Sequence, residues 1–297
     1  MININFLGTA AHIPTIKKNH SSILLNYKKE NILIDCGEGT QRQFRHAKLN
    51  PCKITRILIT HWHLDHILGI PGLLSTLALS GYNKTLYIYG PSGTKEKINS
   101  LFKTLNFHKE YQIITEEAKG KFLNTKEFYI QAEPMQHKVP CNAYTFVKKE
   151  QIRINKEKLK KSKLPKGPIL KKLKEGKDII YKEKKYKAKD LTYTEPQKKI
   201  TIIMDTLDNK KIISFSKNSD ILISEATFTQ ELKDQAKEHK HLTTTQAAQN
   251  AKKSKSKKLI LTHISQRYEN KTKEVLKEAQ DIFKETILAK DLDEISL

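Results

Sequence analysis

The chain has 297 residues, enough to bury a substantial core and close to the upper limit of one domain. Its 55 lysines and arginines against 32 acidic residues give a formal charge of +23, which favours a polyanionic partner, although coding bias towards lysine would give the same composition. No window approaches the roughly 18 apolar residues of a membrane helix, and residues 1–7 alternate like a strand, so we expect a cytoplasmic protein without a membrane partner. Three cysteines without a CxxC pair indicate neither a disulfide framework nor a cysteine-rich zinc module.

The first sixty residues predict an antiparallel opening of short strands. Apolar residues in short alternating runs predict strands at residues 2–7, 22–27, 31–35 and 56–60. The polar residues 28–30 suit a hairpin connection between the second and third of these strands.

From Gly69 onward helices and strands are expected to mix. We expect helices at residues 72–80 and from Pro91 to about Asn106, and strands at 86–89, 112–115 and 127–132. Regular patterns return at residues 200–205, 212–215 and 221–224, followed by a helix from about Thr244, a strand at 258–262, a helix at 273–283 and a strand at 286–289. Thr243 and Gln246 have the spacing of a capping box. The alternation predicts an α/β sandwich of two sheets with helices outside.

Residues 150–195 lack apolar periodicity and predict an inserted arm that the core does not need. The stretch 148–199 holds nineteen lysines and one arginine against seven acidic residues, which is more than half of the charge excess of the chain. We expect this arm to be flexible without a ligand and to bind phosphates.

Residues 61–66 form an HxHxDH motif directly after the predicted strand 56–60. Alternate side chains of extended backbone share a face, so His61 and His63 can hold one ion while Asp65 and His66 address a second. Nitrogen and oxygen ligands suit zinc, and two ions about 3.5–4 Å apart can stabilise the attacking and leaving oxygens of a displacement. An accidental histidine-rich loop is the alternative, and three imidazoles and a carboxylate within six residues argue against it.

Three further candidate ligands also follow apolar runs. His137 comes after residues 128–132, Asp205 ends the run 200–205, and His263 ends the run 259–263. Each alone has an ordinary explanation, as a loop residue, a turn or cap, and a polar strand terminus. Their shared placement favours a common site.

This ligand pattern resembles the metallo-β-lactamase superfamily, and the rest of the chain resembles the ribonuclease Z family of tRNA 3′-processing endonucleases. HxHxDH alone is shared by many hydrolases and indicates only fold and metal. The segments that narrow the resemblance to ribonuclease Z run nearly from end to end, at residues 6–10, 35–41, 224–228, 241–244 and 263–268.

The resemblance implies a single metallo-β-lactamase-type domain over residues 1–297, an αβ/βα sandwich with the flexible basic arm inserted at 150–195. It also implies two zinc ions per subunit, or other divalent ions in their place. One ion would be held by His61, His63, His137 and Asp205, and the other by Asp65, His66, His263 and the shared Asp205.

The reaction needs further groups. Asp65 can orient the attacking water and take its proton, whereas the leaving ribose oxygen needs a proton from a histidine that binds no metal. The resemblance gives this role to His241, with Glu225 fixing its tautomer; a surface histidine and a buried structural carboxylate are the alternatives. Arg267, assisted by Ser265, could hold a phosphate, with a surface salt bridge as the alternative.

The predicted function is that of a zinc-dependent endoribonuclease that removes the 3′ trailer of precursor tRNA and leaves a 3′-hydroxyl. In the family the arm, here with Gly167 and Pro168, holds the tRNA elbow, and members of this length are commonly homodimers. The alternatives are another hydrolase of this fold acting on a small phosphodiester or thioester, and a non-catalytic RNA-binding module. The family usually has a small residue in the loop that contains His12, and the sequence assigns no role to this histidine.

Overall fold

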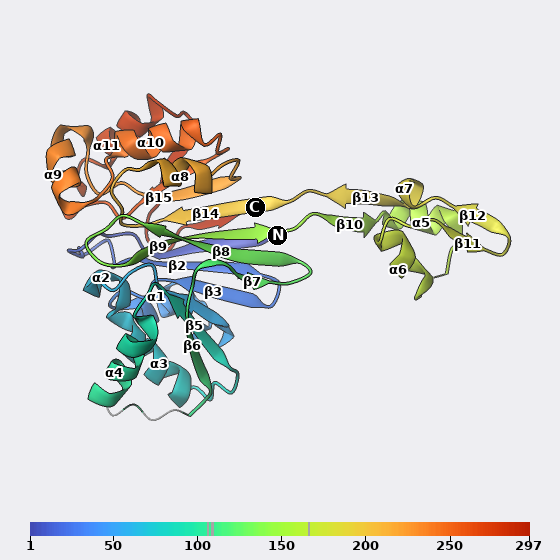
Figure 1. Ribbon diagram of the computed structural model, residues 1–297, viewed down its shortest axis with the longest axis horizontal. Helices are drawn as coiled ribbons and strands as arrows, with labels where there is room; N and C mark the ends of the chain where they lie inside the picture. Colours follow the sequence, from blue (N-terminus) through green and yellow to red (C-terminus); the bar gives the residue numbers. More distant parts are fainter. Residues whose placement is uncertain (106, 108–109, 166) are drawn as a thin grey trace.

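Two central β-sheets pack face to face, and helices cover the outer face of each sheet (Figure 1). The computed structural model describes residues 1–105, 107, 110–165 and 167–297. This arrangement confirms the predicted α/β sandwich. No helix within the described ranges is long and apolar enough to cross a membrane.

The first sheet comes from the first half of the chain and its last strand. Its strands are β1 (Ile2–Gly8), β2 (Ser22–Tyr27), β3 (Glu30–Ile34), β4 (Arg56–Leu58), β5 (Leu86–Gly90), β6 (Ile113–Glu117) and β18 (Glu294–Ser296), in the order β18-β1-β2-β3-β4-β5-β6. β1 to β3 are antiparallel, as predicted, and β3 to β6 are parallel. The helices of this half are α1 (Thr40–His46), α2 (Leu64–Ile67), α3 (Gly69–Leu79) and α4 (Thr94–Thr104), with a 3₁₀ turn at Pro51–Lys53.

The second sheet comes mainly from the second half of the chain. Its strands are β7 (Gly120–Asn124), β8 (Phe128–Met135), β9 (Cys141–Lys148), β14 (Lys198–Ile203), β15 (Ile221–Glu225), β16 (Leu259–Thr262) and β17 (Thr286–Leu288), in the order β17-β16-β15-β14-β9-β8-β7. Its helices are α8 (Lys210–Phe215), α9 (Lys233–His239), α10 (Thr244–Lys253) and α11 (Thr272–Gln280), with 3₁₀ turns at Gln230–Leu232 and Gln266–Tyr268. Thr243 and Gln246 form the predicted capping box of α10.

Three apolar layers hold the sandwich together. The layer between the sheets contains buried side chains of both, such as Phe6 and Tyr144. Phe44 belongs to the layer between the first sheet and its helices, and Leu222 and Ala247 belong to the layer on the second sheet. Burial of this apolar surface is the main stabilising contribution to such a fold.

Most predicted elements lie where the sequence placed them, with shifted ends. The helix expected at 72–80 begins at Gly69, and the run 212–215 lies in helix α8. Strand β9 was not anticipated, because all eight of its residues are buried and it shows no alternation. The expected helix end at Asn106 lies outside the described residues.

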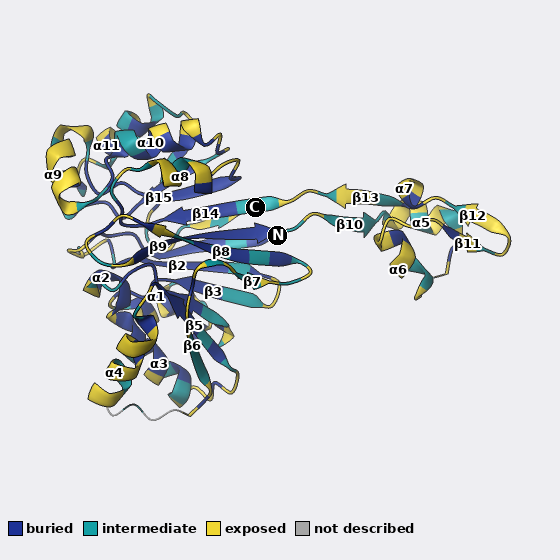
Figure 2. Cartoon of the chain, in the orientation of Figure 1, coloured by how far each residue is buried: buried dark blue, intermediate teal, exposed yellow. Residues whose placement is uncertain are grey.

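The segment 150–195 projects from the sandwich (Figures 1 and 2). A ribbon of β10 (Gln151–Ile154) and β13 (Thr192–Glu195) leads from β9 and β14 to a distal unit. The distal unit contains α5 (Lys156–Ser162), α6 (Ile169–Lys174), β11 (Ile179–Tyr181), β12 (Lys184–Tyr186) and α7 (Ala188–Leu191). It has a small apolar cluster of its own, formed by Leu164, Leu173, Ile179, Ala188 and Leu191. The arm is therefore locally folded despite its weak periodicity, and none of its described residues belongs to the three main layers.

Candidate metal centre

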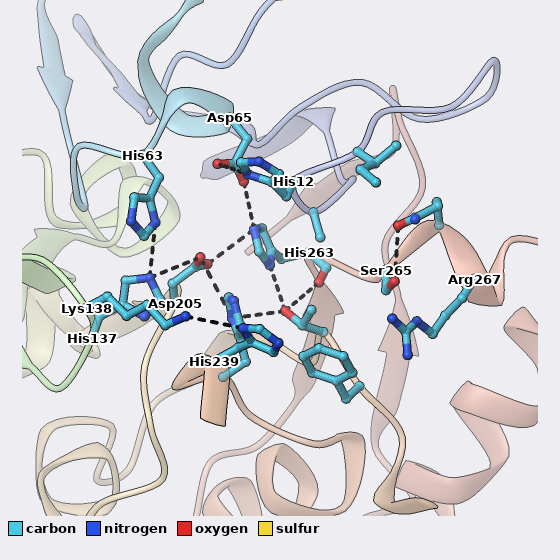
Figure 3. A pocket seen from close by; sticks show the side chains of 16 residues that line it. His12, His63, Asp65, His137, Lys138, Asp205, His239, His263, Ser265 and Arg267 are labelled. Carbon is cyan, nitrogen blue, oxygen red and sulfur yellow. Dashed lines mark hydrogen bonds and ion pairs between the residues drawn. The ribbon is translucent and has the colours of Figure 1, made fainter. Parts of the chain in front are cut away.

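The predicted ligands lie in loops that leave the carboxyl ends of strands in both sheets. Figure 3 shows His63, Asp65, His137, Asp205 and His263 around the pocket that they line. The motif residues follow β4 and continue into α2, His137 follows β8, Asp205 follows β14, and His263 follows β16. The structure brings all seven together in two groups of four that share Asp205. Within each group the candidate donor atoms lie within 4.8 Å of one another.

The first group consists of three imidazoles and one carboxylate oxygen. Nε2 of His61 lies 3.0 Å from Nδ1 of His63, and Nε2 of His137 lies 3.2 Å from the same nitrogen. Oδ2 of Asp205 lies 3.5 Å from Nε2 of His61. Burial lowers the pKa of all three histidines below its usual value, so the rings are neutral and present lone pairs.

The second group lies beside the first and uses the other oxygen of Asp205. Nε2 of His263 is 3.2 Å from Oδ1 of Asp205 and 3.3 Å from Oδ2 of Asp65. Nε2 of His66 is 3.2 Å from the same Asp65 oxygen. Burial would raise the pKa values of the Asp65 and Asp205 carboxyls, but the surrounding imidazoles outweigh this effect and hold both pKa values below the usual range.

The donor set fits divalent cations. Oδ1 of Asp205 is buried and accepts no hydrogen bond from the described residues. A buried carboxylate oxygen facing imidazole nitrogens is costly unless a cation compensates it. Nitrogen and oxygen donors of this kind suit zinc.

Outer hydrogen bonds fix the tautomers of four ligands. Nδ1 of His66 donates to Asp35 at 2.7 Å, Nδ1 of His137 to the Lys240 carbonyl at 3.1 Å, Nδ1 of His61 to the Thr60 hydroxyl at 3.1 Å, and Nδ1 of His263 to the Thr227 hydroxyl at 2.8 Å. The Nε2 lone pairs are therefore directed towards the other candidate donor atoms, where a cation could bind.

Sequence reasoning missed the roles of Asp35, Thr60 and Thr227. Asp35 also accepts from the backbone amide and the hydroxyl of Thr60, at 2.7 and 2.8 Å. Its φ of 56° is in the left-handed region, as is the φ of 57° at His263. Such backbone strain in non-glycine residues concentrates at functional sites, yet a sequence does not reveal it.

His241 and Glu225 form a pair beside the candidate metal ligands, as the resemblance implied. Nδ1 of His241 lies 3.1 Å from Oε1 of Glu225, which also accepts from the Thr206 amide at 2.9 Å. The Thr227 hydroxyl donates to the other Glu225 oxygen at 2.7 Å. Burial disfavours a charged His241, but the carboxylates of Glu225 and Asp205 outweigh it and raise its pKa to about 9.

The remaining predicted residues fall in two places. Ser265 and Arg267 line the pocket over the metal groups, which has a volume of about 500 Å³. Arg267 donates to Gln235 at 3.2 Å and lies over the Phe228 ring, and it forms no ion pair with a carboxylate of the described residues. Gly167 and Pro168 lie in the distal unit of the arm and do not line this pocket.

Comparison with known proteins links this geometry to a family. Residues 2–155 match the family model described as anti-Pycsar protein Apyc1. The chain is 39% identical to the ribonuclease Z of Nanoarchaeum equitans, an alignment that covers 98% of this chain and 92% of the relative. The solved structure of the short form of human tRNase Z is similar with a TM-score of 0.72 and 26% identity, covering 99% and 98% of the two chains.

A more distant structure shows the fold alone. The metallo-β-lactamase fold protein YhfI from Bacillus subtilis has a TM-score of 0.70 and 21% identity, covering 99% of this chain and 98% of that one. The architecture is therefore a metallo-β-lactamase fold.

We expect Asp35→Asn to weaken zinc binding about 10- to 100-fold, the usual cost of removing an outer partner of a ligand histidine. An amide nitrogen at this position would face the Thr60 donors or the His66 donor, because Asp35 only accepts in the present network. Zinc affinity would be measured by competition with a chromogenic chelator.

Asp220→Asn is the matched control, because Asp220 is also a buried carboxylate that accepts from a backbone amide, that of Lys199 at 2.8 Å. It is remote from the ligands and should leave zinc affinity unchanged. Equal zinc affinity in both variants would contradict the assigned role of Asp35.

Proposed function

The chain belongs to the ribonuclease Z family, and from this membership we infer that the protein is a metal-dependent endoribonuclease of tRNA 3′ processing. Its residues 2–155 also belong to the family described as anti-Pycsar protein Apyc1. The inference rests on the sequence identity of 39% to a ribonuclease Z over nearly the whole chain. In addition, every candidate ligand position holds a histidine or an aspartate. Such a complete set favours catalysis over a purely RNA-binding role.

We propose zinc as the metal, with two ions per subunit held by the two groups that share Asp205. The supporting observations are the two sets of four nitrogen and oxygen donors and the unpartnered Asp205 oxygen. Two such ions lower the pKa of a shared water and offset negative charge on the phosphate.

Asp65 is proposed to orient the attacking water and to accept its proton. Its Oδ2 faces His66 and His263, whereas its Oδ1 faces the pocket, where His12 is its neighbour at 3.2 Å. The low pKa of Asp65 keeps the carboxyl ionised at neutral pH. The water oxygen bonds to phosphorus while the bond from phosphorus to the ribose 3′-oxygen breaks.

His241 is proposed to give the departing 3′-oxygen its proton. Glu225 accepts from Nδ1 of His241, so the transferable proton is on Nε2. With a pKa of about 9 the ring carries this proton at neutral pH, which general acid catalysis requires. The products are a tRNA with a 3′-hydroxyl and a trailer with a 5′-phosphate.

The basic arm is proposed to bind precursor tRNA away from the cut. A-form RNA presents phosphates and few readable base edges, so a lysine-rich projection recognises charge and shape. Gly167 and Pro168 directly precede α6 and are not among the residues that line the pocket. Figure 1 shows α6 in the distal unit, beyond the ribbon β10–β13 and away from the two sheets. The homodimer and the cytoplasmic location suggested by the sequence stay proposals.

The function is tested with purified, zinc-loaded protein and a labelled precursor tRNA that carries a 3′ trailer. We expect one cut that leaves a 3′-hydroxyl on the tRNA, and loss of activity with a chelator and in Asp65→Ala. A chelator-sensitive protein that cleaves bis(p-nitrophenyl) phosphate but no precursor would instead indicate a small-molecule phosphodiesterase.

His241→Ala should lower precursor cleavage about 10²- to 10⁴-fold, the usual contribution of a general acid. Hydrolysis of bis(p-nitrophenyl) phosphate should fall far less, because nitrophenolate leaves without a proton. Glu225 raises the pKa of His241, so Glu225→Gln should move the alkaline fall of precursor cleavage from about pH 9 to lower pH. Equal losses of His241→Ala on both substrates would argue against the proton-donor role.

Deleting the arm should weaken precursor binding and reduce the salt dependence of the affinity. Lys148 and Lys198 are direct partners in β9 and β14, so an Asn-Gly turn can replace residues 149–197. Precursor affinity would be measured between low and moderate salt, with circular dichroism as the control for folding. An affinity and salt slope equal to wild type would show that the arm does not bind the precursor.

A further inference from the structure

The loop between β1 and β2 contains an exposed histidine at the mouth of the metal pocket. The His12 side chain is 75% exposed, and its Nδ1 lies 3.2 Å from Oδ1 of Asp65 (Figure 3). Ala11 and Ile13 on either side of it also line the pocket, and Ile13 is 51% exposed. An exposed ring and an exposed apolar side chain thus lie together beside a candidate metal ligand.

This loop is anchored to the sandwich on both sides of His12. Ala10 forms bridges with His20 and Ile264, and the His12 carbonyl accepts from Nε2 of His20 at 3.1 Å. Further along, the Thr15 hydroxyl donates to Glu269 at 2.7 Å. The position of His12 is therefore set before any ligand arrives, and such preorganisation lowers the ordering cost of binding.

We propose that the His12 ring, with Ile13 beside it, stacks on the first nucleobase of the trailer and so determines which RNA ends are cut efficiently. Unpaired bases are commonly bound by stacking on aromatic side chains, histidine included. The hydrogen bond from Nδ1 to Asp65 sets the orientation of the ring, and the exposure of the side chain leaves ring surface free. The inference rests on the proposed function.

The direction of the reaction indicates that the base beside His12 belongs to the trailer. His241 marks the side of the departing tRNA oxygen, and Asp65 marks the side of the attacking water. His263 lies between them, with Nε2 3.3 Å from Asp65 and its ring centroid 5.6 Å from that of His241. In an in-line displacement the attacking water and the departing tRNA oxygen are on opposite sides of phosphorus, and the 5′-oxygen of the trailer lies in the plane between them. His12, on the Asp65 side, is therefore away from the departing tRNA, so a base that stacks on it is assigned to the trailer.

Three substitutions separate stacking from orientation of Asp65. His12→Ala removes the ring and the hydrogen bond, His12→Phe keeps a ring without a donor, and His12→Asn keeps a donor without a ring. The measured quantity is the ratio of kcat/KM for a precursor tRNA to kcat/KM for bis(p-nitrophenyl) phosphate, with zinc-loaded protein.

We expect this ratio to fall about 5- to 100-fold in His12→Ala, the range measured for one base stacked on an aromatic ring, mostly through KM. The ratio for His12→Asn should fall to the same extent, and the ratio for His12→Phe should equal that of the wild type. A precursor with an abasic first trailer nucleotide should lower the wild-type ratio by the same factor and should not lower that of His12→Ala further.

Two results would overturn the stacking role. One is a wild-type ratio in His12→Ala; the other is a wild-type ratio in His12→Asn with a loss in His12→Phe, which would mean that His12 acts only through Asp65. Failure of the proposed function would look different, since the wild-type protein itself would then leave the precursor uncut.

Discussion

The site depends on one buried carboxylate, that of Asp205, whose two oxygens face two different groups of imidazoles. Oδ2 faces His61 and Oδ1 faces His263, and neither ring can turn away because its other nitrogen is bonded to a threonine hydroxyl. Converging lone pairs repel one another, and a buried anionic oxygen without a donor is costly. A divalent cation held by these donors would resolve both problems, so the fold that positions the candidate ligands also favours metal binding.

The direction of the strands explains why the sequence could predict so much of this centre. β8, β14, β15 and β16 all run the same way in the second sheet, so their carboxyl ends gather at one edge. That edge presents His137, Asp205, Glu225 and His263. His137, Asp205 and His263 each follow an apolar run that is visible in the sequence, so the rule that polar residues at strand ends meet in space favoured a common site for them. The division into two ligand sets and the role of Glu225 came from the family resemblance.

The supporting residues could not be found in that way. Asp35 acts through contacts with residues 25 and 31 positions away, and strand periodicity says nothing about which carboxylate will face which imidazole. Thr227 is similar, since a single hydroxyl joins His263 to Glu225. The small core of the arm was missed for another reason. Leu164 lies between α5 and α6, and the other four residues come from elements of three to six residues, which are too short to show a period.

The lysines proposed to bind RNA lie in the arm, apart from the residues proposed to carry out the reaction. Exposed charges are screened beyond about 8–10 Å at physiological salt, so lysines in the distal unit of the arm cannot alter the pKa values or the metal ligands of the pocket. On the proposed function these lysines act on the RNA alone, and the ribbon β10–β13 holds them away from the sandwich. At the two candidate metal groups the opposite holds, because most of their imidazoles and carboxylates are buried and interact strongly with one another. On the proposed function, the length of the ribbon sets the distance along the RNA between the site where the arm binds and the cut. The metal centre then needs to recognise only the phosphate that lies at this distance.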